Sequence, residues 1–270
     1  MLYDIDQLIK GIQEHATIDT YARKLYLTGR EKEFNKLKAV LCAFFVWAQL
    51  VYKPDGRYDT FLANVLEEGS LMLPKGISIV SWNYDSQIEN AYKAYNHDGK
   101  LPLFEKNIQG EWPKLTNSGR IVKINGSATF EDKSTIQYIK EDEENMPAAL
   151  QVIEFYHDSQ VDTSGIGLYF NTHLSFAWEE SPNNEKIKTT LTQTTNDTEI
   201  VVVIGYSFPF FNRVTDRAIF SGMPNLEKVY VQDINPDAVI QAIHAVLPSD
   251  RKVNVEPIRN CGQFYLPVEL

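Results

Sequence analysis

The sequence lacks the short motifs that mark several common enzyme classes. It has only two cysteines, Cys42 and Cys261, and no CxxC pair, so a zinc module with four cysteine ligands is excluded. None of the five histidines forms an HExxH or HxxxH spacing, and the chain has no GxSxG and no GxxxxGKS/T. We therefore expect no metal, no hydrolase triad on a nucleophile elbow and no P-loop chemistry.

Long apolar runs and a basic, apolar leader are also absent. The most apolar stretch is AVLCAFFVWA, residues 39–48, which is too short for a bilayer span of about 20 residues. The start, MLYDIDQLIKGIQEH, has no basic segment followed by an apolar core, so no secretory signal is expected. Two cysteines are most simply reduced thiols of a cytoplasmic protein. We predict a cytoplasmic protein without a membrane segment, in which residues 39–48 belong to a core helix.

Positive charge is scarce, since 26 Lys and Arg face 36 Asp and Glu for a net charge of −10. An acidic surface repels phosphate backbones and anionic lipid, so neither nucleic acid nor a membrane is an expected partner. A small anionic ligand stays possible, because backbone N–H groups at a helix N-terminus can hold it. With 43% hydrophobic residues, the 270-residue chain can bury one large core or one core plus an insertion.

Helical periodicity dominates the first seventy residues and strand–helix alternation the last third. Apolar residues recur every three or four positions after Thr17 or Asp19, either of which can cap a helix, and Gly29 divides this stretch in two. EIVVVIGYS, EKVYVQDIN and KVNVEPI indicate strands separated by helices. We predict one α/β domain over 1–270: a Rossmann-like parallel sheet with helices on both faces, a helical N-terminal segment and an irregular insertion at 98–195.

Polar clusters follow three of the predicted strands: SWNYD at 81–85, GYSFPFFN at 205–212 and QDINPD at 232–237. In one parallel sheet, all three would lie at the carboxyl edge, where open α/β sheets bind ligands. Gly205 permits close backbone approach and Ser207 offers a hydroxyl, which suits an anion or a ribose. Asp233 is placed to grip a ribose diol. Helix capping explains each cluster separately and stays an alternative.

Taken together, SWNYD, VKINGS (122–127) and IGYSFPFFN (204–212) resemble, in order and spacing, the sirtuin-like domain of bacterial and archaeal proteins. That family includes NAD-hydrolysing effectors of antiphage defence. The resemblance implies NAD as ligand or substrate and cleavage of the nicotinamide–ribose bond. It implies that Asn83 positions the nicotinamide ribose or a water. It also places Asn125 at the position of the family's general base. The nucleotide contacts that it implies are Asp85, Gly126, Ser127, Gly205, Tyr206, Ser207, Asp233 and Asn235.

Two departures from the family pattern weaken the implied activity. The family's lysine–hydrophobic–HGS motif is here KINGS, so its general-base histidine is Asn125. An amide does not accept a proton near neutral pH, and general-base assistance contributes about 10²- to 10⁴-fold. Loss of nicotinamide through an oxocarbenium-like step needs no base, so slow hydrolysis stays possible. The family's GAG-type phosphate loop does not precede TIDTY (17–21), so either the chain begins after that element or the phosphate site is built otherwise.

Three hypotheses remain open from the sequence. The chain is an NAD-consuming enzyme of bacterial defence, a module that holds NAD or an ADP-ribose-like nucleotide without turnover, or a domain that docks a protein partner. The first two predict a nucleotide ligand, and a protein partner, a trigger or an oligomer fits any of them. The absence of zinc-binding cysteines separates the chain from the protein deacylases among sirtuins.

Overall fold

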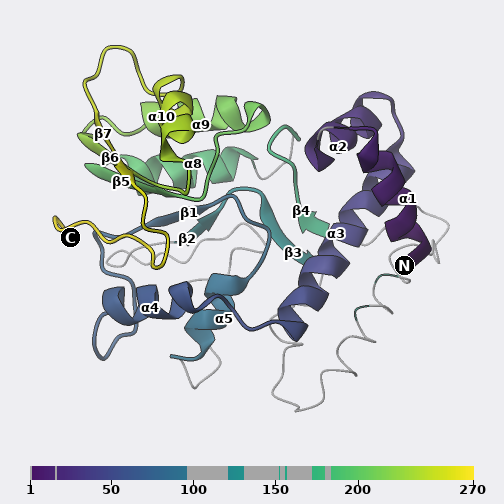
Figure 1. Ribbon diagram of the computed structural model, residues 1–270, viewed down its shortest axis with the longest axis horizontal. Helices are drawn as coiled ribbons and strands as arrows, with labels where there is room; N and C mark the ends of the chain where they lie inside the picture. Colours follow the sequence, from purple (N-terminus) through teal and green to yellow (C-terminus); the bar gives the residue numbers. More distant parts are fainter. Residues whose placement is uncertain are drawn as a thin grey trace. The chain divides into compact units, whose positions relative to one another are not determined.

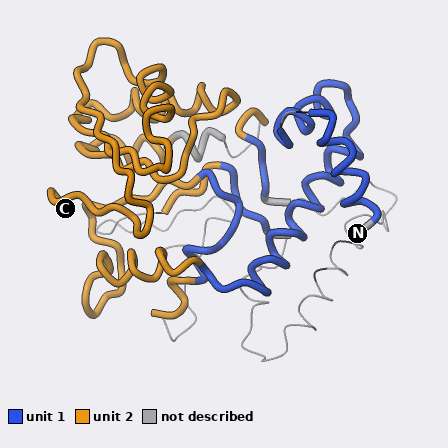
Figure 2. Tube along the Cα trace, viewed as in Figure 1, with its two compact units in different colours: residues 1–54, 82–90, 125–176 blue, residues 55–81, 91–124, 177–270 orange. Residues whose placement is uncertain are grey.

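The computed structural model describes residues 2–15, 17–95, 121–130, 152, 156, 172–179 and 184–270 (Figure 1). The chain divides into two compact units, each built from several segments (Figure 2). Unit 1 comprises residues 1–54, 82–90 and 125–176, and unit 2 comprises residues 55–81, 91–124 and 177–270. The two are described separately below. Most of the predicted insertion at 98–195 lies outside the described residues.

Unit 1 begins with helices α1 (Leu2–Gln13), α2 (Ile18–Leu27) and α3 (Glu31–Val51). Thr17 caps α2, because its side-chain oxygen accepts a hydrogen bond from the backbone N–H of Thr20 at 3.2 Å. Gly29 separates α2 from α3 and adopts a left-handed φ of +68°, as expected for a residue just beyond a helix end. The predicted division at Gly29 is therefore confirmed, and Thr17 rather than Asp19 is the cap.

Helix α3 contains the apolar run 39–48 but extends well beyond it, to 21 residues. By length and composition alone, α3 qualifies as a membrane-crossing helix, the one such helix among the described residues. Buried helices of water-soluble folds pass the same test, and α3 packs on α2 and on strands β3 (Gly126–Phe130) and β4 (Thr172–Leu174). Its buried side chains are Phe34, Leu37, Ala39, Val40, Cys42, Ala43 and Val46.

Strands β3 and β4 pair antiparallel, with Gly126 opposite Leu174 and Phe130 opposite Thr172. Gly126 and Ser127 are the first two residues of β3. A turn lies just before them, and Gly126 adopts a left-handed φ of +70° as the chain leaves it. A glycine is favoured at this position because residues with a Cβ seldom adopt that conformation.

Unit 2 contains α4 (Gly56–Val65), β1 (Ile79–Ser81), β2 (Ile121–Lys123) and the whole C-terminal segment. Helix α5 (Gln87–Lys93) crosses the boundary between the units. The C-terminal segment runs through α8 (Asn184–Thr195), β5 (Ile200–Ile204), η1 (Phe210–Asn212), α9 (Arg213–Ser221), β6 (Lys228–Gln232), α10 (Pro236–His244) and β7 (Asn254–Ile258). The predicted strand–helix alternation of the last third is confirmed.

The strands of unit 2 form two separate parallel sheets, β1–β2 and β5–β6–β7. The mixed α/β class is therefore confirmed, but the expectation that the three predicted strand ends belong to one sheet is wrong for the strands described. Apolar runs identify strands locally, whereas strand partners are set by contacts distant in sequence, which a run of residues does not encode.

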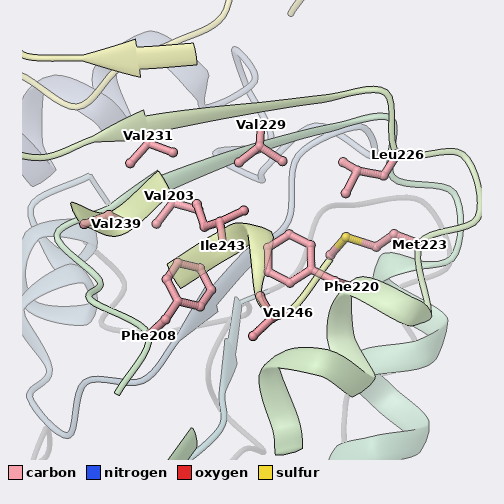
Figure 3. Packing of buried hydrophobic residues seen from close by; sticks show 10 residues of the cluster. All are labelled: Val203, Phe208, Phe220, Met223, Leu226, Val229, Val231, Val239, Ile243 and Val246. Carbon is pink, nitrogen blue, oxygen red and sulfur yellow. The ribbon is translucent and has the colours of Figure 1, made fainter. Parts of the chain in front are cut away.

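Apolar side chains from β5, β6, α9 and α10 form a compact core on one side of the three-stranded sheet (Figure 3). Val229 and Ile243 are fully buried, and both aromatic rings in the cluster, Phe208 and Phe220, lie beside Ile243 (Figure 3). The other members are Val203, Met223, Leu226, Val231, Val239 and Val246. This core fixes the strands whose ends carry the predicted ligand-binding turns.

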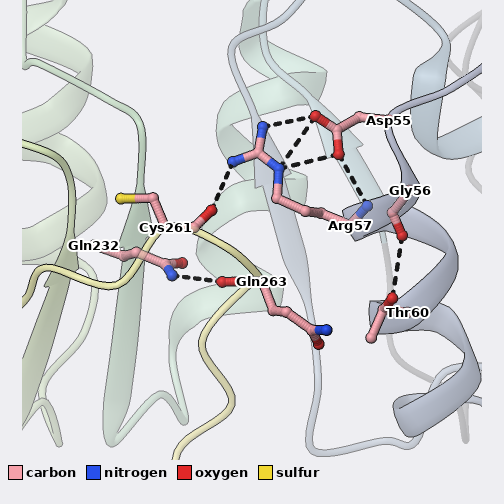
Figure 4. Close-up of polar contacts among 7 residues, drawn as sticks. All are labelled: Asp55, Gly56, Arg57, Thr60, Gln232, Cys261 and Gln263. Carbon is pink, nitrogen blue, oxygen red and sulfur yellow. Dashed lines mark hydrogen bonds and ion pairs between the residues drawn. The ribbon is translucent and has the colours of Figure 1, made fainter.

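The C-terminal tail is tied to unit 2 by the side chain of Gln232, the last residue of β6 and 3% exposed. Its Nε2 donates to the carbonyls of Asn260 at 2.5 Å and Gln263 at 2.6 Å, and its Oε1 accepts from the N–H of Tyr265 at 3.0 Å. Figure 4 shows a second tie, in which the guanidinium of Arg57 donates to the carbonyl of Cys261 at 3.3 Å.

Replacing Gln232 with alanine is expected to lower the free energy of unfolding by about 1–3 kcal/mol, because three backbone groups of the tail lose their hydrogen-bond partner. Urea titration measures the change, and limited proteolysis should release the tail earlier than in wild type. Gln263→Ala is the matched control, since the contact to Gln263 uses its main-chain oxygen. Equal urea midpoints for Gln232→Ala and wild type would contradict the role assigned to this side chain.

Candidate functional site

The ten predicted site residues divide between the two units. Five lie in unit 1 and follow β1 and β2: Asn83, Asp85, Asn125, Gly126 and Ser127. The other five lie in unit 2 and follow β5 and β6: Gly205, Tyr206, Ser207, Asp233 and Asn235. Each group has its own local geometry.

In unit 1, Asn125 ties together the two turns that carry the predicted residues. Its side chain is 6% exposed, and its Nδ2 donates to the carbonyl of Trp82 at 3.2 Å. Close by in the chain, the N–H of Ala128 donates to the carbonyl of Tyr84 at 2.8 Å. The amide at the family's general-base position is thus part of the packing that holds the SWNYD turn.

Asp85 caps helix α5, because its Oδ1 accepts from the N–H of Gln87 at 3.1 Å. Helix capping, the simpler explanation of this acid, is therefore confirmed. The start of α5 is also held by α3, since Gln49 Oε1 accepts from the N–H of Ser86 at 2.6 Å. Asn83 is exposed, two residues before the capping acid. These two hydrogen bonds anchor the turn, in which Asn83 is an exposed residue.

In unit 2, the two predicted turns follow neighbouring parallel strands at the same level. Ile204 is paired with Gln232, the last residue of its strand, and the N–H of Gly205 donates to the carbonyl of Gln232 at 3.1 Å. The segments 205–207 and 233–235 therefore start side by side at the carboxyl edge of this sheet. Open α/β sheets bind ligands at this edge.

Gly205 has a left-handed φ of +59°, and a Cβ placed there would meet nothing within 4 Å. The glycine is therefore favoured by the backbone conformation, and the space beside it is open to an approaching group. Ser207 is exposed two residues later. Together they present main chain and a hydroxyl to solvent at the end of β5.

Asp233 shapes the turn after β6, because its Oδ1 accepts from the N–H of Asn235 at 2.8 Å. Its Oδ2 has no hydrogen-bond partner within the described part of the chain. Asn235 is exposed and precedes Pro236, the first residue of α10, without a capping bond from its own side chain. A carboxylate that braces its own turn with one oxygen can still offer the other to a ligand hydroxyl.

Tyr206 points its hydroxyl into the protein rather than toward solvent. The hydroxyl lies 2.9 and 3.1 Å from the two carboxylate oxygens of Asp216, to which it donates, and it accepts from Asn212 Nδ2 at 2.8 Å. Asn212 is 7% and Asp216 1% exposed. Burial raises the pKa of Asp216 to about 7. Burial and the neighbouring carboxylate also raise the pKa of Tyr206.

Sequence reasoning missed Asn212 and Asp216, which complete this buried network. Their spacing of four residues places both on one face of the helical segment η1–α9, a signal that is visible in the sequence. Such a pair is common on any helix, however, and its meaning depends on where the Tyr206 side chain goes. The network anchors the loop that carries Gly205 and Ser207.

Phe208 is held in an unusual backbone conformation in the same loop, with a left-handed φ of +53°. This region costs a bulky residue about 1–2 kcal/mol. The ring is 8% exposed and packs on Tyr206 with centroids 4.7 Å apart and on Phe220 at 6.0 Å. Buried packing therefore overrides the local preference and forces the chain between β5 and η1 into a tight course.

Within the described ranges, no group of three or more His, Cys, Asp or Glu side chains is arranged to hold a metal ion. No known protein family, no curated protein and no solved structure matches this chain. The assignment of a function therefore depends on the geometry of the two turns and on the sequence resemblance.

Asp216→Asn is expected to flatten the dependence of stability on pH between about pH 4 and 7. The fold favours the protonated carboxyl, so this stabilisation is complete below about pH 4 and is lost as pH rises through about 7. The slope is at most about 1.4 kcal/mol per pH unit. Asparagine keeps an acceptor oxygen for Tyr206 without the charge, so the variant should gain on wild type at pH 8.

Thermal unfolding of both proteins at several pH values tests this, with exposed Asp250→Asn as the matched control. The control should follow wild type throughout. Parallel curves for Asp216→Asn and wild type would show that Asp216 does not titrate in this range.

Proposed function

We propose that this protein binds NAD, or another nucleotide that contains ADP-ribose, at the carboxyl edge of β5 and β6. The observation that carries the proposal is the pairing of Ile204 with Gln232, which starts the turns at Gly205 and Asp233 at the same level. Two strand-to-helix turns side by side at this edge offer separate positions for a diphosphate and a ribose.

The chemistry of the two turns suits the two halves of such a ligand. The turn at 205–207 has an open backbone at Gly205 and an exposed hydroxyl at Ser207, both suited to phosphate oxygens. The turn at 233–235 has a carboxylate, which accepts hydrogen bonds from a ribose diol. The net charge of −10 favours a ligand held by such local donors over binding to a polyanion.

The resemblance of SWNYD, KINGS and GYSFPFFN to sirtuin-like domains supports the same ligand. It extends the proposal to a sirtuin-like protein of bacterial antiphage defence with a Rossmann-like sheet. The diphosphate loop of that family has no counterpart among the described residues. The one Gly-x-Gly of the sequence, Gly165-Ile166-Gly167, lies outside them.

Cleavage of the nicotinamide–ribose bond is the catalytic form of this proposal. In this form, exposed Asn83 would orient a ribose hydroxyl or a water. Buried Asn125 supplies no base, and its amide is already engaged with Trp82. Hydrolysis would therefore proceed by unassisted departure of nicotinamide and be slow, and binding without turnover is the form that the geometry supports best.

Asp233→Asn is expected to weaken NAD binding about tenfold or more, measured by titration calorimetry, because a neutral amide is a poorer acceptor for the ribose hydroxyls. The amide oxygen still accepts from the N–H of Asn235, so the fold is retained. Asp237→Asn, in the exposed ion pair with Arg259, removes the same charge nearby and should bind as wild type. If calorimetry of the wild-type protein detects no heat of binding with either NAD or ADP-ribose, the proposed ligand is wrong.

Asn125→His is expected to raise the rate of nicotinamide release from NAD, by up to about 10²- to 10⁴-fold if the imidazole acts as base. Chromatography of the released nicotinamide measures the rate. Asn83→Ala should abolish release in both backgrounds while leaving the melting temperature near that of wild type, since Asn83 is exposed. Release that is unaffected by Asn83→Ala would place the chemistry elsewhere.

A further inference from the structure

The outer edge of β5 is open within the described residues. Strand β5 is terminal in the order β5–β6–β7 and pairs with β6 alone. The carbonyl of Glu199 and the N–H of Gly205 are both bonded to β6 or the residue before it. Because main-chain groups alternate in direction along a strand, those of Ile200, Val202 and Ile204 are directed to the open edge.

The sequence of β5 lacks the features that protect an edge strand. Edge strands usually carry a charged residue, a proline or a bulge, whereas β5 is Ile-Val-Val-Val-Ile. Continuous β-branched apolar composition is typical of a strand paired on both sides. Ile204 is nevertheless 38% exposed. The strand therefore has the composition of an interior strand and the position of an edge strand.

The open edge is also symmetric about Val202. The sequence of β5, Ile-Val-Val-Val-Ile, is the same in both directions. Of the residues whose main chain is directed outward, Val202 is central, and Ile200 and Ile204 lie two residues to either side of it. A two-fold axis at Val202 in an antiparallel pair sets Val202 opposite Val202 and Ile200 opposite Ile204. Every outward N–H then meets an outward carbonyl, which gives about six hydrogen bonds with apolar cross-strand pairs only.

We infer that the protein forms a homodimer in which the β5 edges of two copies pair antiparallel about Val202, joining their three-stranded sheets into one. A surface that is complementary to itself in this way is what a two-fold interface requires. The occupant of the open edge is thus a second copy of this chain.

The charges that flank β5 favour this arrangement. Asp197 and Glu199 precede the strand, whereas the first charged residue after it is Arg213 at the start of α9. Antiparallel pairing keeps the acidic starts of the two β5 strands apart. Each acidic start then lies near the end of the other copy's β5, which has no acidic residue before Arg213. Parallel pairing would set the acidic ends side by side, which is unfavourable.

Val202→Lys is expected to convert the dimer into a monomer, because it sets two ammonium groups opposite each other at the two-fold axis. Sedimentation velocity of the full chain measures the oligomeric state at about 50 μM, a concentration at which a dimer of micromolar affinity is populated. Wild type should give about twice the 30.9 kDa mass of the chain. Val268→Lys, at a valine that is 90% exposed, is the matched control and should stay dimeric. A monomeric wild type would overturn the inference.

A second variant keeps the test decisive if Val202→Lys fails to fold. Opposed residues of a hydrogen-bonded antiparallel pair have Cα atoms about 5.5 Å apart, within the range of a disulfide. Val202→Cys in a Cys261→Ser background should therefore form a covalent dimer on mild oxidation, whereas Val268→Cys in that background should not. A dimer that Val202→Cys does not cross-link would use another surface and would also overturn the inference.

Discussion

Alignment of two neighbouring strand ends is the constraint on which the candidate site of unit 2 depends. Parallel pairing of β5 with β6 brings Ile204 opposite Gln232, and the bond from the Gly205 N–H to the Gln232 carbonyl continues the ladder into the first turn. A shift of one residue would turn every side chain of β5 to the other face and separate the two turns in level. The core around Val229 and Ile243 opposes such a shift, since both side chains are fully buried. Packing far from the edge therefore fixes where a ligand group could meet Gly205 and Asp233.

The loop after β5 is shaped from the inside as well. Tyr206 is joined to Asp216 and Asn212 beneath the loop, and the Phe208 ring occupies the core with a left-handed backbone. Both side chains turn inward, whereas Gly205 before them and Ser207 between them remain at the surface. The strained backbone of Phe208 and the burial of the Asp216 carboxyl group each cost free energy, and together they hold Gly205 and Ser207 in place. Rigid presentation of main chain and hydroxyl is what an anion-binding turn needs, because it lowers the entropy lost when a ligand is bound.

Local sequence signals predicted the elements of this fold better than their partners. The Thr17 cap, the break at Gly29 and the three C-terminal strands depend on neighbouring residues, and each is found where expected. The separation of β1–β2 from β5–β7 depends on contacts between distant segments, which the apolar pattern of one strand does not specify. The site shows the same division. Asp85 was identified as a possible cap from its position before a helix, whereas the inward turn of Tyr206 depends on Asp216, ten residues further on.

The use made of Asn125 argues for a site adapted to hold a ligand rather than to turn it over. A general base must be free to accept a proton from a water or a hydroxyl, which requires an accessible lone pair. Asn125 is buried and donates its amide hydrogen to the carbonyl of Trp82, in the turn that displays Asn83. The Asn125 side chain is thereby engaged in positioning the turn. In the turns at Gly205 and Asp233, by contrast, the main chain of Gly205 and the hydroxyl of Ser207 are exposed, and Asp233 uses only one carboxylate oxygen within its own turn. Under the proposed function, the two turns of unit 2 would therefore supply the binding groups, whereas Asn125 has a structural role in its own turn.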